Sequence, residues 1–198
     1  MRLRKKQTPL AMTLSSSLLL LASTSSEARD LQWVLQMGVD VGGDKIADIY
    51  FTDGSNQTIN AGGLIQFGGG VLIDTLSASS IYQTQLTINW KFDSAEASNG
   101  DVSWDRYPLE VIQFYNTDLI RIGAGLSYHL SPAVSTSGFA SGNDIDFDNA
   151  LGLVLEVDYK FGEKGYFGGR LTSIEYQEST TGTTIDGSSI GVTLGAHF

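Results

Sequence analysis

Residues Tyr82 to Phe92 read YQTQLTINWKF, and this stretch separates two kinds of side chain with a period of two. The even positions are mostly apolar or aromatic, and the odd positions are all polar. The two sets are Tyr82, Thr84, Leu86, Ile88, Trp90 and Phe92 against Gln83, Gln85, Thr87, Asn89 and Lys91. Side chains of a β-strand alternate between its two faces. The stretch therefore predicts a strand with one apolar face and one polar face.

The same alternation recurs along most of the chain. It covers residues 31–41, 65–74, 106–115, 119–130, 144–161, 167–172 and 189–198, which with 82–92 makes eight strands. Beyond residue 28 there is no apolar run of about 20 residues, the length of a membrane-spanning helix. The 3.6-residue period of an amphipathic helix is also missing. The sequence thus predicts an all-β protein.

The composition of the polar faces indicates which way the sheet faces. In a soluble sandwich the apolar face points inward, whereas in a transmembrane barrel it points to lipid and the lumen is small and polar. The polar faces here combine Gly, Gln, Ser and Thr with charges of both signs, which suits a narrow lumen. We expect a paired lumen network of Arg106, Glu110, Arg121, Glu156, Asp158, Lys160 and Arg170.

The amino terminus has the order of a secretory signal peptide. Four positive charges (Arg2, Arg4, Lys5 and Lys6) precede a largely uncharged stretch, and Ser26-Glu27-Ala28 places small residues where a signal peptidase cleaves. We expect residues 1–28 to be a cleaved signal peptide and residues 29–198 to form the barrel. A membrane anchor is the rival interpretation, but the apolar run is too short and is interrupted by Ser and Thr.

Charge and cysteine content narrow the class further. Removing residues 1–28 removes four of the 12 Lys and Arg and one of the 22 Asp and Glu, which leaves 8 against 21 and a net charge of −13. Such a chain would repel nucleic acid, so we expect no DNA or RNA partner. Cysteine is absent. An exported chain without disulfides needs a sizeable core or a closed sheet.

Connection lengths and aromatic positions support a membrane barrel. Short turns (75–79, 116–118, 162–165) alternate with longer connections (42–62, 93–103, 131–143, 177–187), as periplasmic turns and external loops do. Aromatic residues gather at the two strand ends, which is typical of interfacial girdles. In the first long connection, Asp53-Gly54 lies between two alternating segments and predicts a hairpin. We expect the first two strands to continue outward as one long hairpin, bent near Gly42-Gly43.

These features together resemble the small outer-membrane barrels of Gram-negative bacteria, of the OmpA transmembrane domain, OmpX and OmpW type. The resemblance is one of pattern over residues 31–198. It implies an eight-stranded antiparallel up-and-down transmembrane β-barrel with an extended first extracellular hairpin. It also implies that the last strand is a signal for the barrel assembly machinery, carried by Ile190, Val192, Leu194, Ala196 and Phe198.

Two motifs are candidates for chemistry. Ser127 and His129 share one face of a strand, but a spacing of roughly 7 Å is too long for the hydrogen bond of a nucleophilic pair. The aspartates of Asn143–Asn149 alternate as in a calcium loop, yet Asn149 and Leu155 replace the glycine and glutamate that such a loop needs. We expect no catalytic residue, cofactor or metal ligand, and interpret the aspartates as a solvated rim; loose divalent binding that bridges lipopolysaccharide phosphates stays open.

The sequence therefore predicts a non-enzymatic, monomeric protein of the cell outer membrane with a structural or surface-interaction role. Its partners would be outer-membrane lipid, lipopolysaccharide and the barrel assembly machinery. A small pore for small or apolar solutes is the alternative, because inward glycines could widen the lumen. Eight strands leave little room beyond side chains, which argues against it. A lipid A-modifying enzyme is the third hypothesis.

Overall fold

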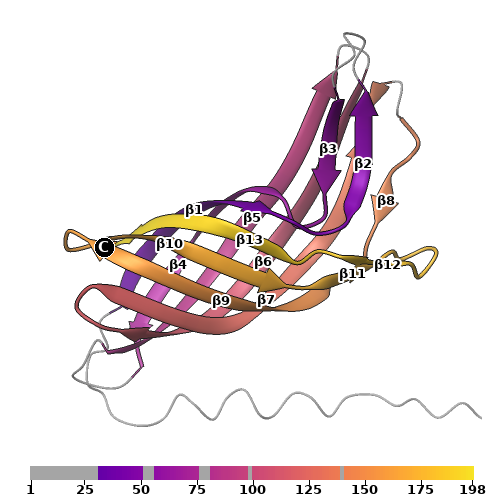
Figure 1. The fold of residues 1–198 in the computed structure, drawn as a ribbon. Coiled ribbons are helices and arrows are strands. Elements are labelled where there is room, and N and C mark those ends of the chain that lie inside the picture. Colours follow the sequence, from indigo (N-terminus) through magenta and orange to yellow (C-terminus); the bar gives the residue numbers. More distant parts are fainter. Residues whose placement is uncertain (1–30, 51–55, 76–80, 98–99, 139–140) are drawn as a thin grey trace, which may run out of the picture.

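A closed antiparallel barrel of eight strands forms the body of the protein (Figure 1). The structure is a computed structural model and describes residues 31–50, 56–75, 81–97, 100–138 and 141–198. The expected signal peptide and the Asp53-Gly54 turn lie outside these residues. The wall strands are β1 (Leu31–Val41), β4 (Leu64–Asp74), β5 (Tyr82–Ala97), β6 (Gly100–Asn116), β7 (Ile120–Thr136), β9 (Ala150–Phe161), β10 (Gly165–Ser173) and β13 (Ser189–His197). The predicted fold class is confirmed.

The first and last strands close the wall. β1 and β13 pair antiparallel from Val34 opposite His197 to Val41 opposite Ile190. Beyond this ladder, Trp33 N donates to Phe198 O at 2.8 Å, and Phe198 N donates to Trp33 O at 2.9 Å. The aromatic terminus is therefore hydrogen-bonded into the wall. We name this end of the barrel, which also holds the turns after β6 and β9, the terminal end, and the opposite end the loop end.

Five short strands stand at the loop end: β2 (Lys45–Tyr50), β3 (Asn56–Asn60), β8 (Ile145–Asp146), β11 (Glu175–Gln177) and β12 (Thr184–Asp186). β2 and β3 pair with each other in a sheet of their own, because the β1–β4 ladder stops at Asp40 opposite Leu64. Gly42 and Gly43, with φ of 128° and 76°, turn the chain at this break. One continuous first hairpin is therefore not confirmed.

β5, β6 and β7, the longest strands, also extend outward beyond the barrel, beside β2 and β3 (Figure 1). The β5–β6 ladder runs on to Ala97 opposite Gly100, and β7 continues to Thr136. Residues 93–97, 100–103 and 131–136, expected as loop, are thus strand. The reason is that inward alternation continues beyond the barrel belt, where Ala95, Trp104 and Val134 are buried.

The outer wall is apolar around the whole barrel. Large hydrophobic side chains on all eight wall strands point outward and are exposed; examples are Leu35 at 59%, Ile88 at 58%, Leu153 at 62% and Val192 at 64%. Their chain neighbours point inward, and these are buried or, at several glycines, half-buried. No helix in the described part of the chain is long and apolar enough to cross a membrane.

Aromatic rings cluster at both edges of this apolar belt. At the terminal end the ring centroids of Tyr82 and Tyr115 are 5.5 Å apart, and those of Tyr159 and Phe167 are 5.6 Å apart. Toward the loop end Trp90 stacks on Phe92 at 4.4 Å. The two heights of aromatic residues expected from the sequence are therefore present in the fold.

The segment 144–161 is not one strand, as expected, but two. β8 pairs with β7, and β9 begins only at Ala150. Between them the Asn149 side chain accepts a hydrogen bond from Ser131 N at 2.9 Å, and the alternation changes phase. Phe147, expected on the apolar outer face with Leu151, is consequently buried at 8% exposure in the interior.

Inward glycines let neighbouring backbones pack closely. A Cβ on Gly70 would collide with the carbonyl of Leu86 on the next strand, whereas a Cβ on the outward Gly169 would meet no atom within 4 Å. We predict that Gly70→Ala lowers the free energy of unfolding by about 1–3 kcal/mol through overpacking. Gly169→Ala is the matched control and should stay within about 0.5 kcal/mol.

Urea unfolding in detergent, followed by tryptophan fluorescence, measures both changes. Equal stability of the two variants would contradict the close packing of β4 on β5.

Candidate functional site

The interior of the barrel is the candidate site, and its loop end is filled by an apolar plug. We define the plug as the buried cluster centred on Trp104, which is 0% exposed. Its ring meets Phe147 and Tyr176 edge to face at 5.2 and 5.4 Å, and Trp104 Nε1 donates to Ala61 O at 3.0 Å. The other members are Ile59, Ala95, Val134, Ala150 and Ile174.

An ion-pair network lies in the lumen between the plug and the terminal end. Arg170 bridges two carboxylates, with Nη2 on Glu110 and Nη1 3.2 Å from Glu156. Arg121 bridges Glu156 at 3.3 Å and Asp158 at 2.6 Å. All five side chains are at most 3% exposed. The structure thus brings together five of the seven charged residues that the sequence singled out.

The other two lie elsewhere. Arg106 is fully buried, but its Nη2 donates to the carbonyl of Gly63 and its guanidinium lies 4.8 Å from the Trp104 ring. Lys160 lines a polar mouth of about 300 Å³ at the terminal end, beside His197. Neither forms an ion pair within 4.0 Å in the described part of the chain, so the expected pairing of all seven is wrong for these two.

A further ion pair was missed by the sequence analysis. Lys91 Nζ lies 2.7 Å from Asp40 Oδ2, and both side chains are 3% exposed. Lys91 also donates to Ser189 Oγ at 3.4 Å. Both residues stand on the polar faces of their predicted strands, which is the signal that could have placed them in the lumen.

Aromatic rings narrow the lumen toward the terminal end. The guanidinium of Arg121 lies 3.5 Å from the ring centroid of Tyr166 and 4.1 Å from that of Phe114. Such stacking is favourable for a desolvated cation. The charged layer is therefore held between two sets of rings, with the plug at one side and these two residues at the other.

The pore alternative supposed that the inward glycines widen the lumen, but they do not. Large side chains lie directly over them: Phe114 over Gly123, and Tyr166 over Gly195. Asp40 and Asp158 lie in the same way over Gly191 and Gly168. The missing Cβ atoms make room for the rings and charges that fill the lumen.

Ser127 and His129 are hydrogen-bonded, so the expected separation is wrong. His129 Nε2 lies 3.0 Å from Ser127 Oγ, because the two side chains lean toward each other along β7. Ser127 donates to Glu110 Oε1 at 2.9 Å, and Tyr176 Oη lies 2.7 Å from His129 Nδ1. The result is a buried chain of hydrogen bonds that runs from Tyr176 in the plug to Glu110 in the ion-pair network.

The donor and acceptor roles in these hydrogen bonds decide what Ser127 can do chemically. The Ser127 hydroxyl donates its hydrogen bond to Glu110. His129 Nε2 must therefore carry a proton and donate to Ser127 Oγ, while His129 Nδ1 accepts from the Tyr176 hydroxyl. A nucleophilic serine instead donates its proton to the histidine. Ser127 is also 0% exposed. This arrangement orients the serine without activating it.

The acidic segment 143–149 makes local hydrogen bonds at the loop end. Asp144 accepts from both the hydroxyl and the N–H of Thr136 at 2.8 Å, and these bonds lower the pKa of Asp144. Asp148 accepts from Ser179 Oγ at 2.7 Å. Within the described residues no group of three or more His, Cys, Asp or Glu side chains could hold a metal ion.

The residues expected to form the assembly signal share the outer face of β13. Ile190, Val192, Leu194 and the terminal Phe198 are 47–64% exposed, and Ala196 is half-buried.

Two solved structures share this architecture. Ail of Yersinia pestis, solved in complex with the heparin analogue sucrose octasulfate, matches with a TM-score of 0.55 and 7% identity over 87% of this chain and 100% of Ail. Neisserial surface protein A matches with a TM-score of 0.50 and 12% identity over 87% and 100%. The chain has the fold of small outer-membrane β-barrels. No protein-family model and no curated protein matches the sequence.

The network predicts a large effect of removing its shared cation. Arg170→Ala leaves Glu110 and Glu156 buried without their common partner, which should lower the free energy of unfolding by about 3–5 kcal/mol. Lys160→Ala, at the polar mouth, is the control and should change it by less than about 0.5 kcal/mol. Urea titrations in detergent compare the two. Similar losses from both variants would show that the network does not stabilise the barrel.

Proposed function

We propose that this chain is an exported integral protein of the outer membrane, whose sealed barrel has a structural or surface-interaction role. The observation that carries the proposal is the inverted distribution of polarity. Apolar side chains cover the outside of all eight wall strands, while ion pairs and amides fill the inside. In water such an apolar outer face would cause aggregation, whereas in a bilayer it contacts the lipid tails.

The proposed orientation places the terminal end at the periplasm and the loop end outside the cell. The loop end carries the plug and nearly all of the extended hairpins, which is where outer-membrane barrels have their longer connections. The aromatic clusters at the two edges of the belt mark the expected membrane interfaces.

A pore is disfavoured by the packing of the lumen. The plug, the ion pairs and the stacked rings succeed one another along the axis, and each layer is formed by buried side chains. The enzyme hypothesis is disfavoured by the direction of the Ser127 hydrogen bond and by the burial of that serine. The structural or surface role is therefore the preferred function.

The negative charge of the loop end argues against a sulfated ligand like the one bound to Ail. Carboxylates crowd the loop end: Asp44, Asp48, Glu96, Asp101, Asp144, Asp146, Asp148, Glu175, Glu178 and Asp186. Lys45 is the one exposed lysine or arginine on the described loop-end segments. A polyanion would be repelled by this surface, so a cationic partner or divalent cations between the surface and lipopolysaccharide fit it better.

A conductance measurement tests the sealed lumen. The mature chain, reconstituted in a planar lipid bilayer, should insert without giving reproducible current steps, because three layers of side chains block the axis. A known porin inserted by the same procedure confirms that the assay detects channels. Regular steps from the wild-type chain would favour the pore function instead.

The role of β13 in assembly is tested separately. We propose that the barrel assembly machinery reads its outer face, and that the chain then stands in the membrane as a monomer. Phe198→Asp should lower the outer-membrane level several-fold, because a charge replaces the aromatic ring that ends the closing strand. Phe198→Tyr keeps the ring and is the control. Normal outer-membrane levels of Phe198→Asp would contradict the assembly role.

A further inference from the structure

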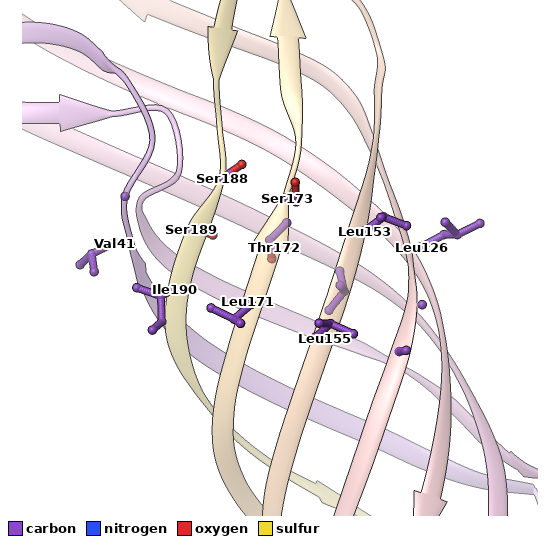
Figure 2. A pocket seen from close by; sticks show the side chains of 14 residues that line it. Val41, Leu126, Leu153, Leu155, Leu171, Thr172, Ser173, Ser188, Ser189 and Ile190 are labelled. Atoms are coloured by element: carbon purple, nitrogen blue, oxygen red, sulfur yellow. The ribbon is translucent and has the colours of Figure 1, made fainter.

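The polar mouth at the terminal end is a hollow of a different kind from those on the outer wall. The outer hollows, such as the one bordered by Leu126, Leu153 and Leu171 (Figure 2), are apolar and belong to the lipid-facing belt. The polar mouth lies at the end of the lumen and has a volume of about 300 Å³. It has room for a solute on the order of ten non-hydrogen atoms, taking about 30 Å³ for each as for water.

The wall of the mouth is polar and is held in place by its own hydrogen bonds. Every wall strand except β4 supplies a residue to it, and apart from glycines each lining residue has a polar or charged side chain. Asn116 Nδ2 donates to Gln83 Oε1 at 3.0 Å, and Gln83 Nε2 donates to Asp74 Oδ1 at 2.8 Å. Gln83 and Asn116 are both buried, so this part of the wall is ordered without a ligand.

Arg121 closes the inner end of the mouth. All three of its guanidinium nitrogens are hydrogen-bonded: Nε to Asp158 at 2.6 Å, Nη1 to Gln85 at 3.1 Å and Nη2 to Glu156 at 3.3 Å. The guanidinium also stacks on the ring of Tyr166. This arginine therefore belongs to the ion-pair network and has no nitrogen left for a further anion.

Lys160 is the lining cation that lacks a carboxylate partner. Its side chain is half-buried, and within the described residues its ammonium has no hydrogen bond or ion pair. The two carboxylates that line the mouth, those of Asp118 and Glu163, are exposed and stand at its rim. The mouth thus has a positive group inside and negative groups at its edge. This distribution fits a small zwitterion that enters with its carboxylate first.

Gln32 and His197 add neutral hydrogen-bonding groups to the mouth, and both are half-buried. Gln32 Oε1 accepts a hydrogen bond from His197 Nδ1. With its proton on Nδ1, the neutral imidazole keeps Nε2 as an acceptor, and Gln32 keeps its amide nitrogen as a donor. One acceptor and one donor side by side match the backbone N–H and C=O groups of a short peptide.

We propose that the polar mouth binds a zwitterionic dipeptide. The peptide carboxylate pairs with Lys160, and the peptide ammonium lies near Asp118 and Glu163 at the rim. The backbone groups between these two ends bond to Gln32 and His197. The inference goes beyond the structural role, and binding does not depend on that role. In the proposed orientation the mouth opens to the periplasm, so the ligand comes from there and the closed inner end keeps it from passing through.

Saturation-transfer NMR of the mature chain in detergent tests the site. The probes are alanyl-alanine, its N-acetyl derivative without the ammonium, and its C-terminal amide without the carboxylate. Alanyl-alanine should bind saturably. The amide should bind about tenfold more weakly, because it loses a charge-assisted hydrogen bond in the half-buried part of the mouth. The N-acetyl derivative should bind only about two- to threefold more weakly, because the rim is exposed. Equal affinities, or no saturable binding of alanyl-alanine, would overturn the proposal.

Lys160 and Lys164 provide a matched pair of variants. Lys160→Gln should weaken alanyl-alanine binding about tenfold and leave the weak binding of the amide unchanged. Lys164 is exposed in the turn after β9 and does not line the mouth, so Lys164→Gln should leave both affinities unchanged. Asp118→Asn combined with Glu163→Gln should reduce alanyl-alanine to the affinity of the N-acetyl derivative. Similar losses from both lysine variants in about 0.15 M salt, where charges are screened over about 8 Å, would contradict the site.

Loss of binding is distinguishable from loss of fold and from failure of the proposed function. The Lys160 variant should unfold at the urea concentration of the wild type, so its weaker binding is not a folding defect. If the wild-type chain inserts into lipid without current steps but does not bind alanyl-alanine, only the dipeptide site fails. If the chain binds alanyl-alanine in detergent but is not found in the outer membrane, the proposed function fails and the site stands.

Discussion

The pairing of β13 with β1 is the constraint on which the rest of the structure depends. A sheet in lipid has no water to satisfy the backbone groups of an open edge, so it must close. The ladder from Val34–His197 to Val41–Ile190 performs that closure, and the Trp33–Phe198 bonds complete it at the terminal end. Once the sheet is closed, period-two alternation sends every second side chain into a narrow interior and every other one to the lipid.

The narrow interior must then accommodate both large and charged side chains. Four cations and four carboxylates of the lumen, among them Lys91 with Asp40 and Arg170 with Glu110 and Glu156, lie at most 3% exposed. Burial of charge is tolerable only when each group is paired or hydrogen-bonded. Glycines at the inward positions provide the space, because Phe114 and Tyr166 occupy the sites that Cβ atoms would take. The filled lumen therefore stiffens the wall instead of opening a path.

Features that depend on position within one strand were predictable from the sequence, whereas features that depend on long-range packing were not. The period of two was enough to predict the strand number, and the composition of the polar faces predicted the inward direction of Arg121, Glu156 and Arg170. Closure of the sheet was predicted from that composition, from the connection lengths and from the resemblance to outer-membrane barrels. The Ser127–His129 bond depends on how side chains lean, and the phase change at Asn149 depends on a bond to Ser131 from another strand. The interruption at Gly42-Gly43 and the turn of β11–β12 likewise arise from contacts between distant segments.

The central claim is that apolar side chains face lipid while the polar set faces a sealed interior. Spin labels placed one at a time along β9, from Leu151 to Val157, measure it most directly in liposomes through their collision with oxygen and with a water-soluble nickel complex. The account predicts that labels at the odd positions, such as Leu153 and Leu155, collide with oxygen far more often than labels at Gly152 and Glu156. It also predicts little nickel access at either set. Uniform access along the strand, or nickel access at the odd positions, would contradict a barrel immersed in lipid.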